Sequence, residues 1–119
     1  MDIILTEQEL MLKSTVRDFA ERELIPRAPA YDEKEEFPWE NFKSLGDMGL
    51  MGFTVEEPYG GAGGSYAQCA VVIEEVAKGC AATSVSYLAH LSLALATFEY
   101  SNEDQKTRYL PPLTSGKQL

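Results

Sequence analysis

Residues 82–98, ATSVSYLAHLSLALATF, decide the fold class of this chain because they form its longest strongly apolar stretch. Apolar side chains recur along it at helical spacing, and it contains no Asp, Glu, Lys or Arg. The repeating positions are Val85, Leu88, Leu91, Leu95 and Phe98. A helix that is apolar nearly all round is normally buried among other elements. The stretch therefore predicts a central helix, buried on almost every side, around which the other segments pack.

Three more helices are predicted from capping boxes, in which a polar N-cap residue pairs with a Glu or Gln three residues later. The pairs are Thr6 with Glu9, Ser65 with Gln68, and Asn102 with Gln105. The first of these helices carries an apolar stripe at Leu12, Val16, Phe19, Ala20 and Leu24. The second is expected to carry a continuous apolar face at helical spacing, made of Tyr66, Cys69, Ala70, Ile73, Val76 and Ala77.

Prolines and glycines mark the expected ends of these helices, since proline removes a helical hydrogen bond and glycine favours other conformations. We expect the helix after Thr6 to stop at Pro26 and Pro29, and the helix after Ser65 to stop at Gly79. The last helix should end near Leu110, because Pro111 and Pro112 follow.

Between the first two capping boxes, residues 31–37 read as an acidic connector, after which Pro38 is expected to open another helix. That helix should run through Trp39, Phe42 and Leu45 and end at the glycines that follow. Residues 51–55 could form a short strand, but they run directly into Glu-Glu-Pro, so an irregular connection is favoured. The whole chain, 1–119, is therefore expected to be one all-α domain, a bundle of about five to six helices.

Composition limits the possible functions. The 119 residues, 45% of them hydrophobic, suffice for one core. The net charge of −9 argues against a general role on nucleic acids or membrane surfaces. Cys69 and Cys80 lie in apolar surroundings and are expected to be reduced. No signal or transit peptide is recognised, and no apolar run approaches the ~18 residues of a membrane span, so a soluble, cytoplasmic, bacterial-like protein is expected.

The glycine-rich segment 60–64 (GGAGG) precedes a predicted helix, where free backbone amides could hold a phosphate. It follows no clear strand, however, and it lacks the Gly-Lys-Ser/Thr ending of a P-loop. A structural turn is therefore the favoured interpretation.

No side chains form a complete catalytic constellation or a metal site. His90 is the only histidine and is expected to be a hydrogen-bonded packing residue rather than a base or ligand. Glu74 and Glu75 are adjacent, so they point about 100° apart on a helix and are expected to be solvated. Only the hydroxyls of Ser84, Ser86 and Ser92, mixed into the apolar helix, hint that part of it borders a cavity.

Five segments, taken in order, resemble the flavin-dependent acyl-CoA dehydrogenases. They are Thr6-Glu-Gln-Glu-Leu, Arg22-Glu-Leu-Ile-Pro26, Leu45-Gly-Asp-Met-Gly-Leu-Met-Gly52, Glu74-Glu-Val-Ala-Lys-Gly79 and Asn102-Glu-Asp-Gln-Lys-Thr-Arg-Tyr-Leu-Pro111. Tyr59-Gly-Gly-Ala-Gly also looks like a loop of this family. Ser86-Tyr-Leu-Ala-His-Leu-Ser92 further resembles isovaleryl-CoA-type members, with Leu88 where those carry Gly. The resemblance covers essentially the whole chain.

The resemblance implies the N-terminal helical domain of a larger enzyme, in which FAD is held mostly by a β-barrel and a C-terminal domain that do not match any part of these 119 residues. It implies α,β-dehydrogenation of an acyl-CoA thioester, an electron acceptor such as electron-transfer flavoprotein, and a homotetramer. The positions that match pocket-lining residues of the family are Ser84, Val85, Leu88 and Ser92. No residue here matches the catalytic carboxylate, and no flavin-binding residue is assigned.

Two alternatives stay open. The chain could be a self-sufficient helical interaction module that keeps the scaffold without the chemistry, which a native stop after Leu119 would favour. Within the enzyme class, acyl-CoA oxidases and nitroalkane-oxidase-like proteins share the fold, so the electron acceptor and the acyl substrate are not determined.

Overall fold

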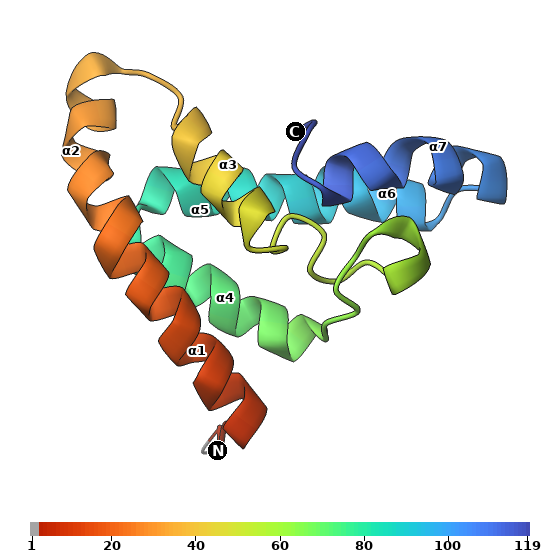
Figure 1. Cartoon of the computed structure of the whole chain (residues 1–119), viewed down its shortest axis with the longest axis horizontal. Coiled ribbons are helices and arrows are strands. Elements are labelled where there is room, and N and C mark those ends of the chain that lie inside the picture. The colour runs from red at the N-terminus through yellow and green to blue at the C-terminus, as the bar shows by residue number, and fades with distance from the viewer. Residues whose placement is uncertain (1–2) are drawn as a thin grey trace.

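The computed structural model describes residues 3–119; all of its regular secondary structure is helical, and no strand occurs in the described part of the chain (Figure 1). Two of its rods are continuous through several segments: α1 (Glu7–Phe19), η1 (Ala20–Leu24) and α2 (Ile25–Lys34), and α5 (Ala81–Ala89), η3 (His90–Leu95) and α6 (Ala96–Glu99). The remaining elements are α3 (Trp39–Asp47), the 3₁₀ turn η2 (Glu57–Tyr59), α4 (Tyr66–Gly79) and α7 (Glu103–Thr114). The prediction of an all-α bundle is confirmed.

The three predicted capping boxes are all formed. At the start of α1, the Thr6 hydroxyl accepts from the Glu9 amide at 3.2 Å, and the Glu9 carboxylate accepts from the Thr6 amide at 2.8 Å. Ser65 with Gln68 and Asn102 with Gln105 repeat the arrangement at α4 and α7. Each box satisfies amides that the first helical turn leaves unpaired.

The helix ends predicted from proline are wrong at both places. Pro26 lies in the first turn of α2, where a missing N–H is tolerated, and helical structure continues past Pro29 to Lys34. The helix α2 follows directly on η1, a π-helical segment at whose end the Ile25 amide donates to the Ala20 carbonyl five residues back. The predicted acidic connector is therefore reduced to residues 35–38.

The last helix also continues through its prolines. Pro111 and Pro112 lie inside α7, which ends at Thr114 rather than Leu110. Leu113 and Thr114 are buried, and the Thr114 hydroxyl donates to the Tyr59 carbonyl at 2.9 Å. Packing of this last turn thus outweighs the hydrogen bonds lost at the prolines.

The hydrophobic core lies where α4 and the long Ala81–Glu99 rod meet the α1–η1 rod and the connection after α3. In Figure 1, α4 runs between α1 and the α5–α6 rod, and α7 lies beside α6. The largest fully buried side chains come from all of these elements and include Phe19, Leu24, Leu45, Met51, Val72, Tyr87, Leu95 and Leu110.

The Ala81–Glu99 rod is not buried on almost every side, as the sequence suggested. Tyr87, His90 and Leu95 face the core, but Val85 and Leu93 are each 69% exposed. With 19 residues the rod is also long and apolar enough, by length and composition, to cross a membrane, which corrects the prediction that no such stretch exists. Core helices of globular proteins meet the same criterion, and a third of this helix is buried within the domain.

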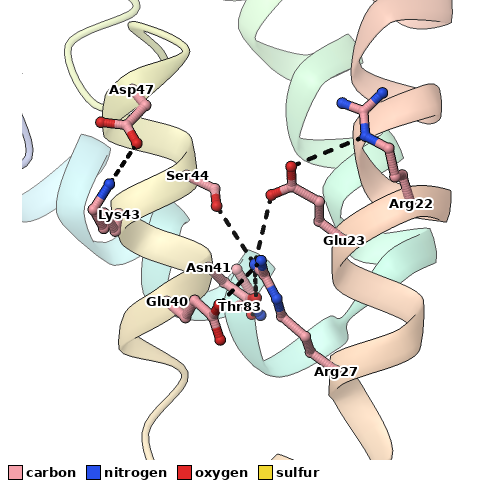
Figure 2. A network of polar contacts seen from close by, with 9 residues as sticks. All are labelled: Arg22, Glu23, Arg27, Glu40, Asn41, Lys43, Ser44, Asp47 and Thr83. Atoms are coloured by element: carbon pink, nitrogen blue, oxygen red, sulfur yellow. Dashed lines mark hydrogen bonds and ion pairs between the residues drawn. The ribbon is translucent and has the colours of Figure 1, made fainter.

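A polar network joins α2, α3 and α5 (Figure 2). Asn41 is completely buried, and its amide donates to the Thr83 hydroxyl at 2.9 Å. The Arg27 guanidinium donates to the Asn41 carbonyl oxygen at 3.3 Å and pairs with Glu23 and Glu40. Because each member is satisfied by another, the network fixes the spacing of three helices without leaving a buried polar atom unpaired.

Glu75 is not solvated, contrary to expectation, whereas its neighbour Glu74 is exposed. The Glu75 side chain is 1% exposed and pairs with Arg17 of α1 at 3.1 Å and with Lys78 at 2.8 Å. Lys13 approaches to 3.8 Å. Burial tends to raise the pKa of Glu75, but the hydrogen bonds from Lys78 and Arg17 outweigh it and hold the pKa below its ordinary value of 4.5.

Because the folded-state pKa of Glu75 is depressed, its ion pairs stabilise the fold above about pH 4.5 and are lost as the pH falls through the folded value. We expect Glu75→Gln to lower the free energy of unfolding at pH 7 by roughly 1–3 kcal/mol, since the cationic partners remain half-exposed. The difference from the wild type should shrink below pH 4.

Urea unfolding at several pH values measures this difference. Glu74→Gln is the matched control, because Glu74 makes only an exposed pair with Lys78 and should change stability little at any pH. Equal losses in the two variants at pH 7 would contradict the assignment of Glu75 as a buried ion-pair centre.

Candidate functional site

An apolar hollow lies between α4 and the Ala81–Glu99 rod. It has a volume of about 170 Å³. Its wall is formed by Thr54, Tyr66, Cys69, Ala70, Ile73, Leu88, Leu91 and Ser92. Thr54 comes from the connection after α3, four residues come from α4, and three come from α5 and η3. Most of these side chains are hydrocarbon or sulfur, so the hollow suits an apolar group.

The structure brings two of the four predicted site residues into this hollow. Leu88 is 47% exposed and lines it together with Ser92, whose hydroxyl donates to the Leu88 carbonyl at 2.7 Å. Ser84 is buried and lies behind the wall, where its hydroxyl donates to the Ile73 carbonyl at 3.4 Å. Val85 is exposed and does not line the hollow.

The apolar face predicted on α4 is divided between the core, where Cys69 and Val76 are buried, and the wall of this hollow. Tyr66 is 74% exposed, and Ala70 and Ala77 are exposed as well. The face that packs toward α1 and η1 carries Val72, Glu75, Val76 and Gly79, and of these only Val76 belongs to the predicted face. Periodicity alone could not distinguish the two faces of α4, because both carry apolar residues at helical spacing. Glu75 also suggests an exposed face, since a glutamate is normally buried only when cationic partners pair with it.

Two buried side chains of the rod hold the connection that supplies Thr54. The Tyr87 hydroxyl donates to the Leu50 carbonyl at 2.6 Å, and the His90 Nε2 lies 3.0 Å from the Met51 carbonyl. Burial lowers the pKa of His90, so its ring is neutral near pH 7 and Nε2 carries the proton that it donates. His90 is thus the hydrogen-bonded packing residue that was predicted.

The glycine-rich loop forms a structural turn, as expected. Each of its amides donates to a backbone carbonyl: Gly60 to Glu57, Gly61 to Glu56, Ala62 to Gly52, Gly63 to Val55 and Gly64 to Phe53. No amide from 60 to 64 remains to hold a phosphate. The loop instead binds the backbone of residues 52–57 through these hydrogen bonds.

The side chains around the hollow support binding rather than bond-breaking chemistry. Burial raises the pKa of the Cys69 thiol, which therefore remains protonated and unreactive. Both cysteines are free thiols. Among residues 3–119, no group of three or more His, Cys, Asp or Glu side chains is placed to hold a metal ion.

Comparisons with known proteins agree on the family. The family model for the acyl-CoA dehydrogenase N-terminal domain matches residues 6–117. The chain is 42% identical to the probable acyl-CoA dehydrogenase YngJ of Bacillus subtilis and 41% identical to the short-chain-specific acyl-CoA dehydrogenase of Clostridium acetobutylicum. Each match covers all of this chain and 32% of the relative.

A solved structure shows the same arrangement of helices. The acyl-CoA dehydrogenase of Bacillus anthracis, complexed with FAD, superposes with a TM-score of 0.86 at 30% identity. The match covers 97% of this chain and 20% of the other. The chain thus spans about a third of the length of its curated relatives, and less of this structure.

Proposed function

The chain belongs to the acyl-CoA dehydrogenase family as an N-terminal domain, and from this premise we propose that its protein oxidises the Cα–Cβ bond of an acyl-CoA thioester. The apolar hollow between α4 and the Ala81–Glu99 rod is the observation that carries the proposal. The residues that line the hollow form one wall of the acyl-binding site, and other parts of the protein supply the remaining walls.

The domain's contribution is to bind and desolvate the acyl chain. Ile73, Leu88 and Leu91 present hydrocarbon to the hollow, so an acyl chain gains free energy as its surface leaves water. Fixing the chain against these walls also restricts the motion of the carbons that react. The Ser92 hydroxyl is already satisfied by the Leu88 carbonyl, so it offers the chain no competing polar contact.

The residues of this domain do not fit a flavin site by themselves. The loop amides at 60–64, which would be the natural cradle for a pyrophosphate, all donate to carbonyls of residues 52–57. FAD, which would accept the hydride when bound, is therefore proposed to be held mainly outside this domain.

We also propose that the protein assembles with itself and passes electrons to a partner such as electron-transfer flavoprotein. The exposed apolar side chains of Val85 and Leu93 on the Ala81–Glu99 rod, which do not line the apolar hollow, support a surface that is covered in the assembled protein.

Anaerobic titration of the full-length, flavin-loaded protein with straight-chain and branched acyl-CoAs tests the proposed activity. We expect the oxidised flavin absorbance to bleach with at least one saturated acyl-CoA and not with the matching enoyl-CoA product. A protein that binds flavin but bleaches with no acyl-CoA, while a chemical reductant bleaches it fully, would contradict the proposal and favour a non-catalytic scaffold.

A further inference from the structure

A second hollow adjoins the acyl hollow and shares one wall residue with it. This polar hollow has a volume of about 230 Å³ and is lined by Thr54, Val55, Glu56, Tyr59, Glu99, Tyr100, Lys106 and Leu110. Thr54 is the residue common to the two linings. Its side chain is half-buried, and among the described residues it makes no side-chain hydrogen bond. Thr54 therefore lies where an apolar hollow meets a polar one, and we call this residue the partition.

The backbone that carries Thr54 is fixed on both sides. From the rod, Tyr87 and His90 bind the carbonyls of Leu50 and Met51. From the glycine-rich loop, the amide of Gly64 donates to the Phe53 carbonyl at 2.7 Å and that of Gly63 donates to the Val55 carbonyl at 2.9 Å. The residues directly before and after Thr54 are thus both tied to the same loop, and the partition cannot move away easily when a ligand presses on it.

Close packing strengthens this restraint. A methyl group added to Gly64 would lie 2.3 Å from the Phe53 ring, and one added to Gly52 would lie 2.5 Å from Thr114. The connection is therefore closely packed against the glycine-rich loop at Phe53 and against α7 at Gly52. A wall of this kind discriminates by size, because an oversized ligand must either distort packed backbone or stay outside.

The polar hollow also discriminates by chemistry. Glu56 and Glu99 both line it, with Lys106 as the cation on its wall. Burial, and then repulsion from Glu56, raises the pKa of Glu99, whereas Lys106 acts in the opposite direction. A hydrocarbon chain that passed Thr54 would have to desolvate these charged groups, which is unfavourable.

We propose that Thr54 is a specificity-determining residue that ends the acyl hollow and sets the longest straight acyl chain that this domain accepts. The inference rests on the proposed function. Thr54 is not among the pocket positions that the family resemblance gave, all of which lie on the Ala81–Glu99 rod. It assigns the length limit to a side chain from the connection after α3, in addition to the wall supplied by Leu88.

Thr54 variants of the full-length, flavin-loaded protein test this inference through kcat/KM over a series of straight-chain acyl-CoAs. We expect Thr54→Ala to raise kcat/KM for chains one or two carbons longer than the wild-type optimum, by roughly ten-fold relative to that optimum. Thr54→Ile should shift preference toward shorter chains. Thr54→Val keeps the shape without the hydroxyl and should leave the length profile unchanged.

Melting temperature and flavin content separate a size effect from a folding defect. If Thr54→Ala loses flavin, Thr54→Ser, which removes only the methyl group, provides the same comparison. An active wild type with the same length profile in the Ala, Ser and Ile variants would overturn the assignment of Thr54 alone. A wild type that is bleached by no acyl-CoA would overturn the proposed function and this inference with it.

Discussion

Gly61→Ala is expected to destabilise the protein by about 3 kcal/mol or more, the largest stability effect anticipated for a single methyl group in this chain. A Cβ at this position would lie 1.9 Å from the Val55 carbonyl oxygen and 2.7 Å from the Val55 Cβ. The first of these atoms belongs to the backbone, so no side-chain rotation relieves the clash. The Gly61 amide would also move away from the Glu56 carbonyl that it binds at 3.2 Å.

Gly63→Ala is the matched control for this prediction. Gly63 lies two residues away in the same loop, and a Cβ there meets nothing within 4 Å. Its φ of +66° still disfavours alanine, so we expect a cost of only about 1–2 kcal/mol. Urea unfolding of both variants gives the comparison, and similar midpoints would contradict the close packing of the loop on residues 52–57.

The second large effect is expected at Leu88, in substrate preference. With the proposed function, Leu88→Gly in the full-length protein should favour bulkier acyl groups by at least about ten-fold in kcat/KM, because it removes a four-carbon side chain from the wall of the hollow. Small acyl groups should be affected less. The structure disfavours the alternative that Leu88 is an ordinary core residue, because 47% of its surface is exposed.

Two control variants separate pocket shape from helix stability. Leu88→Ala keeps a good helix former, so it should shift preference in the same direction without the approximately 1 kcal/mol cost of a helical glycine. Leu93→Ala alters an apolar side chain on the same rod that is 69% exposed and does not line the hollow. A lowered melting temperature in Leu88→Gly with unchanged selectivity in both Leu88 variants would contradict the pocket role.

The starts of helices could be predicted from the sequence, but several of their ends could not. A capping box is local: Thr6, Ser65 and Asn102 each use a residue three positions away, so the signal needs no knowledge of the fold. Proline signals are local too, but tertiary packing overrode them. Burial of the turn after Pro112 and the π-helical segment before Pro26 kept both helices intact.

The hollow itself could be predicted only in part. Leu88 and Ser92 were predicted from the family resemblance, and both line the hollow. Serine hydroxyls on an otherwise apolar helix were a second, weaker indication that this helix borders a cavity. Thr54 was missed because it lies 34 residues before Leu88, in a segment with no periodicity. Glu75 was misjudged for a similar reason, since its partner Arg17 is 58 residues away in the chain.

Photoaffinity labelling tests most directly whether this domain forms the wall of an acyl site. The probe is an acyl-CoA carrying a diazirine at the end of its chain, used on the full-length, flavin-loaded protein with and without excess unlabelled acyl-CoA. We expect competable labels, mapped by mass spectrometry, on peptides that contain Ile73, Leu88 or Thr54. Competable labelling only outside residues 3–119, with the flavin still bleached by acyl-CoA, would contradict the account.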